Sequence, residues 1–539
     1  MYHPVPSIDS DASSNLPNSQ QFRSIRSSIL LSYFMASWAR RGMEFTIALV
    51  LIDLYPDSLL LVSIYGLVDN SVRVTLGGVI GSYLDRAERW PGARNCYMLQ
   101  NGLIFGAGAG MSVVLSGVLG EPGTPTEDMK VWYWLVVVAS LGMTSVSGVG
   151  SLGITIAVEK NLPKQLCGED SSTLSQLNAS FRAIDLVCQL ASPILSGCLM
   201  TYLQPPAAVM ALGTYGFLAW VPELWLLQRA FSASAKLRAP KTVVTVPLDL
   251  VTGSNGTIPQ LKVVPGVKKS SWGVYFRQHL FLANMSLALL YMTVLSLGFL
   301  MTSYLRWCGL TEAEVSLYRG VGALTGLLAT LIFPAVRKKI GVAECGFLGI
   351  SYQLLTLSIG VIPVILYCLE WRIPFMRTFV GDREAAAISN EDLLQGVPSL
   401  GITRLLISAV VASRTGLWLF DLAMTQLVQE EVQEFELGTV CGVQSSIQAG
   451  CETLSFLAGV FLKDPTEFWT LMLGSLCVVS AAWLLYAIYM SRRNRVGASP
   501  YSEADPTSWL REQQQHGDES VGLLSEQQQN PCDEEDTAP

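Results

Sequence analysis

Charged residues are scarce in this sequence. They make up only 14% of its 539 residues, whereas a typical soluble domain has about 25%. Histidine is rarer still: there are three, His3, His279 and His516, and none falls well inside an apolar run. Walker loops, dinucleotide-binding fingerprints and H-E-x-x-H motifs are also absent from the sequence. We therefore expect a protein that is not an enzyme and that needs no cofactor.

Apolar residues are abundant instead. They form 50% of the chain, and the mean hydropathy is +0.39. Runs of about 20 apolar residues are long enough to cross a bilayer as helices, so we predict an all-α polytopic membrane protein, a monomer surrounded by lipid. Twelve spans are expected, at 27–53, 58–80, 95–119, 131–157, 179–203, 206–229, 278–303, 313–335, 341–368, 399–427, 438–462 and 467–491.

A long polar insert divides the spans six and six. The resulting prediction is two six-helix bundles, 27–229 and 278–491, joined by a cytosolic linker over 230–277. Residues 1–26 and the acidic tail 492–539 have few apolar residues and are expected to be disordered. Beyond residue 500 ten acidic residues face one basic residue, Arg511, which accounts for the net charge of −8 and leaves the membrane body near neutral. Nothing in it suggests binding to nucleic acid.

The basic residues between spans predict the orientation. Most of them lie in the N-terminal arm, the even-to-odd loops and the tail, so both termini are expected in the cytosol. A cleavable signal peptide is not expected. The segment Glu519–Leu524 has the spacing of an acidic dileucine signal for a sorting adaptor. We expect the plasma membrane, with a vacuolar membrane as the alternative.

Several charged residues fall inside predicted spans. In FMASWARRGMEF, residues 34–45, Arg40 and Glu44 are four residues apart, so they share one helix face and can pair. A charge at the bilayer centre costs at least roughly 2.5–3.5 kcal/mol, so such residues normally face a bundle interior or a water-filled cavity. Further polar residues in spans strengthen the prediction of an aqueous cavity: Gln100, Asn101, Asn178, Arg182, Asp185, Glu223 and Glu452.

The loop after the second span carries a motif. Gly81-x-x-x-Asp85-Arg86-x-x-Arg89 resembles the signature of the major facilitator superfamily of transporters. A glycine lets two helices approach closely, and an aspartate can accept hydrogen bonds at a helix N-terminus. We expect these residues to belong to a gate between the two bundles.

Long blocks of the chain resemble one family in particular, the ferroportin family of iron exporters. The resemblance runs over about residues 27–490 and rests mainly on SLLLVSIYGLVDNSVRVTLGGVIGSYLDRAER (58–89), GEDSSTLSQLNASFRAIDL (168–186), FLANMSLALLYMTVL (281–295) and TGLWLFDLAMTQLVQEEV (415–432). It implies a major-facilitator-like transporter that exports ferrous and related divalent ions by alternating access.

The metal ligands of this family do not carry over. The resemblance places Arg40 and Glu44 where vertebrate members have an Asp and a His, and Phe299 and Ser455 where they have a Cys and a His. The remaining candidates are Glu44, which can replace a histidine as a carboxylate ligand, and Cys451, beside Glu452 and one turn before Ser455. Divalent iron accepts carboxylate and thiolate donors.

Other family features carry over in part. Gln100, Asn101 and Glu223 match a modulatory calcium cluster, in which Arg40 would act as a built-in cation paired with Glu223 or Glu44. The gating residues Asp85, Arg89, Asn178, Arg182 and Asp185 are retained, whereas a bridging Asp and Arg are replaced by Asn161 and Leu437.

Three functions are therefore open. The first is a secondary-active exporter of divalent metal, ferrous iron above all, that contributes to iron homeostasis. The second is a major-facilitator transporter of another cargo, such as an anion, a metal chelate or an organic acid, because Arg40 and Arg41 suit negative charge. The third is a membrane sensor or scaffold that transports nothing.

Overall fold

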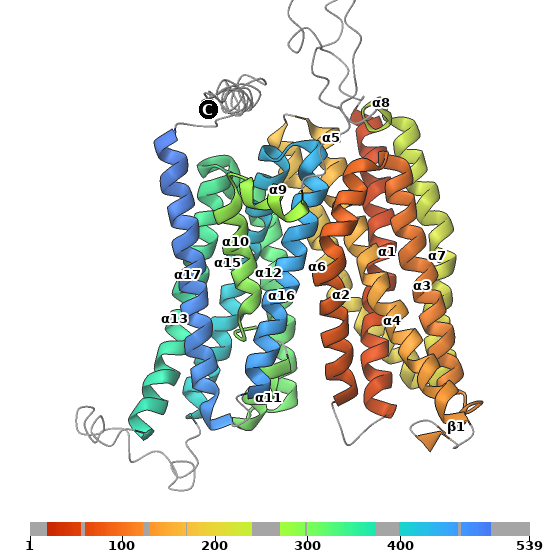
Figure 1. Cartoon of the computed structure of the whole chain (residues 1–539). Coiled ribbons are helices and arrows are strands. Elements are labelled where there is room, and N and C mark those ends of the chain that lie inside the picture. The colour runs from red at the N-terminus through yellow and green to blue at the C-terminus, as the bar shows by residue number, and fades with distance from the viewer. Residues whose placement is uncertain are drawn as a thin grey trace, which may run out of the picture. The chain divides into compact units, whose positions relative to one another are not determined.

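The computed structural model describes residues 19–54, 60–121, 124–125, 129–168, 170–239, 270–296, 299–372, 398–461 and 465–496. Within these ranges the secondary structure is helical apart from one hairpin, in which β1 (Gly120–Glu121) pairs antiparallel with β2 (Thr124–Pro125). The predicted all-α class is confirmed. The described residues up to Ala487 belong to one compact unit, in which the long helices run alongside one another (Figure 1).

Each predicted span overlaps a helix. The long helices are α1 (Ser19–Leu54), α2 (Leu60–Arg86), α3 (Arg89–Leu115), α4 (Lys130–Ile154), α6 (Ser171–Tyr202), α7 (Pro205–Ala233), α12 (Glu312–Ile340), α13 (Val342–Arg372), α15 (Leu400–Glu431), α16 (Glu434–Phe461) and α17 (Phe468–Val496). The short ones are η3 (Thr155–Asn161), α5 (Leu162–Cys167), α8 (Ala235–Arg238), α9 (Ser271–Arg277), α10 (Phe281–Leu289), η5 (Leu290–Met292), α11 (Phe299–Trp307) and η7 (Pro465–Glu467). Among the described residues, eight helices are long and apolar enough to cross a membrane; the count of twelve stays a prediction.

The predicted boundaries differ from the structure in places. Helix α1 begins at Ser19, so residues 19–26, which we expected to be disordered, are helical. Residues 1–18, most of the 230–277 linker and the tail from 497, with the Glu519–Leu524 signal, lie outside the described residues. The division into two six-helix bundles stays a prediction.

Local sequence explains where several helices begin. The Asp170 carboxylate accepts hydrogen bonds from the backbone amides of Ser172 and Thr173 and so caps α6. Thr311 and Glu314 form a capping box at the start of α12. Between α12 and α13 the chain turns at Gly341, whose φ of 96° favours glycine.

The seventh predicted span is not continuous. Its first part forms α10 and the single turn η5, after which Thr293 adopts an extended conformation. The backbone amide of Val294 then donates to the Ser475 hydroxyl, at 3.0 Å, instead of to a helical carbonyl. The helical path resumes as α11 at Phe299, so this segment lines the interior with both helical and extended backbone.

Two sets of contacts join the first half of the chain to the second. Helix α2 packs along α16, and α6 packs against α12 and α15. The α2–α16 contact is close because glycines from both helices meet there: Gly77, Gly81, Gly438 and Gly442. A β-carbon on Gly81 would collide with the backbone carbonyl of Gly438.

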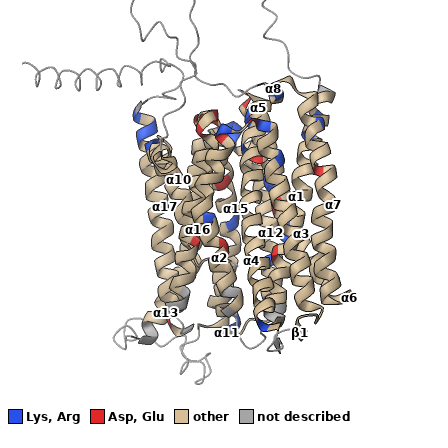
Figure 2. Cartoon of the chain, turned by 45° about the vertical axis from the view of Figure 1, so that its right-hand side comes forward, with Lys and Arg blue, Asp and Glu red and all other residues tan. Residues whose placement is uncertain are grey.

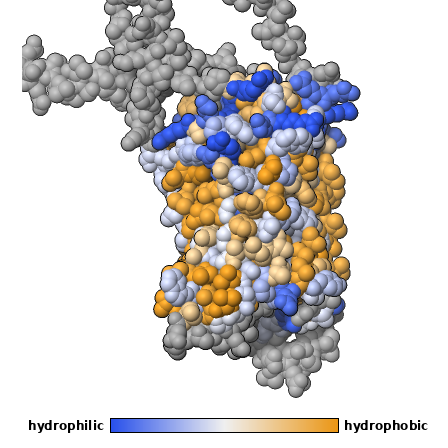
Figure 3. All heavy atoms as spheres, turned by 90° about the vertical axis from the view of Figure 1, so that its right-hand side faces the viewer, coloured by the Kyte–Doolittle hydropathy of each residue, from blue (hydrophilic) through white to orange (hydrophobic). Residues whose placement is uncertain are grey.

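The outer surface is suited to lipid. Large apolar side chains on α3 and α7, such as Val113, Leu218 and Trp225, are exposed, and Figure 3 shows apolar residues in a band on this face, with hydrophilic residues along one edge. A smaller set of charged residues lies among the helices, away from their ends (Figure 2). Because charges are costly in hydrocarbon, these interior residues mark the site.

Candidate functional site

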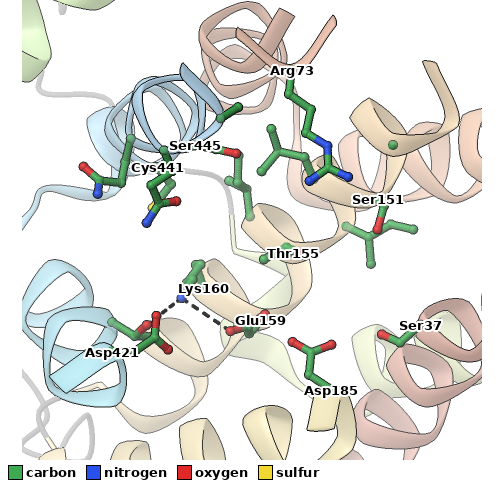
Figure 4. Close-up of a pocket in the computed structure, with 18 of the residues that line it drawn as sticks. Ser37, Arg73, Ser151, Thr155, Glu159, Lys160, Asp185, Asp421, Cys441 and Ser445 are labelled. Carbon is green, nitrogen blue, oxygen red and sulfur yellow. Dashed lines mark hydrogen bonds and ion pairs between the residues drawn. The ribbon is translucent and has the colours of Figure 1, made fainter. Parts of the chain in front are cut away.

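A cavity of about 300 Å³ lies where the two halves of the chain meet. Its walls come from α1, α2, α3, α4, η3 and α6 on one side and from α10, η5, α15 and α16 on the other. Charged side chains of both signs line it: Arg40, Arg41, Arg73, Lys160, Arg182, Glu44, Glu159, Asp185, Asp421 and Glu452. In Figure 4, Glu159, Asp185 and Lys160 point into the same space.

Arg40 and Glu44 lie on the cavity wall within ion-pair distance of each other, at 3.6 Å. The Arg40 guanidinium also lies 3.9 Å from Asp69 of α2 and 3.4 Å from the Ser147 hydroxyl, and it packs against Gly148, where a β-carbon would require it to shift. Arg40 is therefore fixed by α1, α2 and α4 together.

Glu44 is surrounded by guanidinium groups. In addition to Arg40, it lies 3.7 Å from Arg41 and 3.9 Å from Arg73, and Arg73 in turn pairs with Asp69 at 2.8 Å. This carboxylate therefore already has three cationic neighbours, and a metal ion bound by Glu44 would compete with them.

A second charged cluster lines the same cavity. Lys160 pairs with Glu159 at 3.3 Å (Figure 4). It also donates to the Thr425 hydroxyl of α15 at 2.7 Å. Arg182 of α6 forms ion pairs with Asp421 of α15 and, at 3.6 Å, with Asp185. The Tyr33 hydroxyl lies 2.8 Å from Glu159 and 3.2 Å from Asp185, which ties α1 to the same cluster. The cluster spans both halves of the chain.

A proline removes the helical hydrogen bond of the Glu159 carbonyl. In an α-helix the Glu159 carbonyl would accept from the amide four residues on, but that residue is Pro163, which has no N–H. The chain forms the π-helix η3 here, and the Gln429 side chain of α15 donates to the carbonyls of Glu159 and Lys160, at 3.1 and 3.0 Å. Asn178 of α6 donates to the other end of the Gln429 amide at 2.5 Å. The buried Gln429 side chain thus bonds to three residues of the first half of the chain.

The end of α2 and the start of α3 make further contacts with α16. The Asp85 carboxylate accepts from the backbone amides of Gly438 and Thr439 on α16, both at 2.7 Å. Arg89 pairs with Glu434 at 2.6 Å and also donates to backbone carbonyls at Lys236 and Ala239. Arg86, in contrast, is exposed at the end of α2.

Gln100, Asn101 and Glu223 form a buried cluster, of which Gln100 also lines the cavity. The Asn101 amide donates to Glu223 at 2.5 Å, and Gln100 donates to the Ala36 carbonyl at 3.0 Å. The structure gives ion pairs from Arg40 to Glu44 and Asp69 and, within the described ranges, none to Glu223. Of the two partners expected for Arg40, it pairs with Glu44.

The candidates on the second half of the chain are dispersed. Glu452 lines the cavity, whereas Cys451 and Ser455 are not among its lining residues. Phe299 begins α11, and its side chain lies outside the described part. Among the described residues no group of three or more His, Cys, Asp or Glu is placed to hold a metal ion. Within the described residues, the Glu452 carboxylate makes no hydrogen bond and no ion pair.

Sequence reasoning missed several of these residues. Glu159 and Lys160 lie just beyond the predicted fourth span, and Gln429 lies just beyond the predicted tenth. Pro163, four residues after Glu159, was the available signal, because it predicts a carbonyl free to accept a bond from elsewhere.

Comparisons with known proteins agree with one another. A family model described as Ferroportin1 (FPN1) matches residues 23–479. The chain is 30% identical over 477 residues to "Solute carrier family 40 member 1" of Oryza sativa subsp. japonica, covering 86% of this chain and 90% of that protein. A solved bacterial homologue of the iron transporter ferroportin, in an outward-facing state, superposes with a TM-score of 0.69 at 22% identity, covering 87% of this chain and all of the other. The proton:xylose symporter XylE of the major facilitator superfamily gives 0.52 at 12% identity, over 88% and 96%. The predicted major-facilitator fold is confirmed.

Proposed function

This chain belongs to the ferroportin family, and from that premise we propose that it is a secondary-active exporter of divalent metal, with ferrous iron as its cargo. The family predicted from the sequence is thus confirmed, and so is a multi-pass integral membrane protein. The cargo is inferred from the family and from the charges of the cavity.

The pairing of charges in the cavity carries the proposal. Each basic lining residue has an acidic partner within 4 Å: Arg40, Arg41, Arg73, Lys160 and Arg182. The lining carboxylate of Glu452 has no such partner in the described part. The five basic and five acidic lining side chains balance in number, so what favours a cation is the position of Glu452, a carboxylate in the wall that no basic side chain holds in an ion pair.

Glu452 is the first cargo ligand that we propose. Its carboxylate faces the cavity from α16, on the same helix face as Gln444 and Gln448, which also line the cavity. Carboxylate and amide oxygens are donors that ferrous and manganous ions accept. The ligand roles expected of Glu44 and Cys451 remain proposals, and Arg40 acts as a positioning residue that holds Glu44.

Alternating access follows from the contacts that join the halves. Arg182–Asp421, Gln429 with its partners, and Arg89–Glu434 all bridge the halves at one end of the cavity. We infer that they form a gate that is closed in this conformation and opens when the halves rock apart. The basic loops at this end support a cytosolic position for the gate and for both termini.

Flux through liposomes tests the cargo. Purified protein is expected to move Fe²⁺ and Co²⁺ faster than empty vesicles, and Glu452→Gln is expected to lose most of this transport. Thr453→Ala is the matched control, because Thr453 follows Glu452 on α16, does not line the cavity and donates its hydroxyl hydrogen bond to the Ala449 carbonyl of its own helix. Transport no faster than that of empty vesicles would contradict the proposed cargo, and an unimpaired Glu452→Gln would remove the proposed ligand.

One observation keeps a second cargo in view. Five basic side chains line the cavity, and opening the gate would release some of them from their partners to meet an anion or a metal chelate. Such a carrier is expected to ignore free Fe²⁺ and to lose transport of citrate-bound metal on Arg40→Ala. Glu452→Gln would leave that transport intact, which separates the two cargos.

The host membrane is a further proposal. We infer the plasma membrane, with export outward; a vacuolar membrane with the same topology would make the protein a storage transporter. A fluorescently tagged copy distinguishes the two, and Leu523→Ala with Leu524→Ala tests whether a sorting adaptor uses Glu519–Leu524.

A further inference from the structure

Asn284 on α10 is a buried amide without partners. The residue is 1% exposed, and neither the Oδ1 nor the Nδ2 atom has a hydrogen-bond partner within the described residues. Asn284 also lines the cavity. Buried polar groups are nearly always hydrogen-bonded, and leaving one unpaired costs about 1–3 kcal/mol. An orphaned amide in a cavity wall therefore points to a ligand.

The neighbouring glutamine cannot satisfy this amide. Gln444 of α16 accepts from the Tyr275 hydroxyl at 2.5 Å and donates to the backbone carbonyl of Asn284 at 3.0 Å. Both ends of the Gln444 amide are thus engaged, which fixes its orientation. The same bonds hold α10 beside α16 and leave the Asn284 side chain unpaired against the cavity.

Gln448 supplies a second free amide on this wall. It lies one turn beyond Gln444 on α16, lines the cavity and makes no hydrogen bond within the described ranges. Glu452 follows after another turn. Eight residues separate Gln444 from Glu452, about 12 Å along a helix, so Asn284 and Glu452 stand at different depths of the cavity.

We propose that Asn284, with Gln448, forms an amide-lined binding site for the transported cation. This site lies beside Glu452, since Gln448 is one turn before Glu452 on α16. The Asn284 Oδ1 atom accepts from water held by the cation or coordinates the ion itself. Amide oxygen and water are ligands that suit hard divalent ions such as Mn²⁺. The inference rests on the proposed function, since it names a second contact for the same cargo.

Asn284→Leu separates binding from stability. Replacing an unpaired buried amide by an apolar group of similar size is expected to leave thermal stability equal or higher. Binding of Mn²⁺ to the purified full-length protein in nanodiscs, measured by calorimetry, is expected to weaken about tenfold or more. Asn284→Asp adds a negative charge and is expected to strengthen Mn²⁺ binding.

Gln353→Leu is the matched control. Gln353 on α13 is also buried and also has an unpaired amide oxygen, but it does not line the cavity. It is expected to leave the affinity for Mn²⁺ unchanged. An Asn284→Leu protein that binds Mn²⁺ like the wild type would overturn the inference and would show that Asn284 is merely hydrated. If liposomes containing the wild-type protein move Fe²⁺ while Asn284→Leu keeps its affinity for Mn²⁺, only this inference fails. If the wild-type protein moves no Fe²⁺, the proposed cargo itself is wrong.

Discussion

The Arg89 guanidinium, at the start of α3, lies 2.6 Å from the Glu434 carboxylate at the start of α16, and only 5% and 13% of the two side chains are exposed. This pair joins the first half of the chain to the second next to the Asp85 bonds at the start of α16. Its position makes it a direct reporter of whether this end of the cavity is closed.

Arg89→Ala is expected to favour the conformation that is open at this end. Removing one partner of a buried ion pair leaves the other uncompensated, at a cost of roughly 3 kcal/mol. Spin labels at the ends of α2 and α16 would show a longer distance distribution. Arg86→Ala is the control from the same motif, because Arg86 is exposed; an equal shift in both variants would contradict a specific role for the pair.

Gly81→Ala is expected to prevent the close contact of α2 with α16. The added β-carbon would collide with the Gly438 carbonyl, and backbone cannot move aside as a flexible side chain can. Crosslinking between cysteines placed on the two helices should decline. Gly102→Ala in α3, where a β-carbon meets nothing within 4 Å, should crosslink normally and gain up to about 1 kcal/mol of helix stability.

Pro163→Ala restores a backbone amide four residues after Glu159. We expect the Glu159 carbonyl to take up this amide and η3 to tighten toward an α-helix, which weakens the bonds from Gln429. Hydrogen exchange of residues 155–166 should slow, and the gate should open more often. Exchange that stays as fast as in the wild type would show that the proline does not cause the π-helix.

Asp170→Ala is expected to destabilise the start of α6 by about 1 kcal/mol, because it removes the cap. Hydrogen bonds from the Thr173 hydroxyl, and then from backbone amides, hold the pKa of Asp170 below its ordinary value. Since the Asp170 pKa is lower in the folded protein than in the unfolded chain, the cap stabilises the fold fully at pH values above the ordinary pKa of about 3.9. This stabilisation is lost as the pH falls through the lower pKa of the folded protein. Thermal unfolding from pH 3 to pH 7 checks this, and Asp170→Asn should keep most of the cap without the pH dependence.

Much of the fold was predictable because the bilayer imposes long apolar runs. Each expected span overlaps a helix, and the Arg40–Glu44 pair follows from spacing on one helix. The break after Met292 was not predicted, because it depends on Ser475, nearly 200 residues later, which captures the Val294 amide.

The site was predictable only in part. Charges inside spans indicated a cavity, but which acid would meet which base depended on packing between helices far apart in sequence. Arg182 finds Asp421, and Lys160 finds Thr425, across more than 200 residues. Asn284 carried only the general signal of a polar residue inside a span, because an asparagine reveals its missing partners only when its neighbours are in place.

The three bonds of Gln429 have a consequence for the kinetics of the gate. Because one side chain serves Asn178, Glu159 and Lys160, a single rotamer change releases all of them at once. Half-open arrangements would leave the buried amide partly unpaired and are therefore sparsely populated. Opening of the gate should therefore be cooperative, with one closed and one open state. The breaking of the Gln429 hydrogen bonds should contribute most of the free-energy barrier between them.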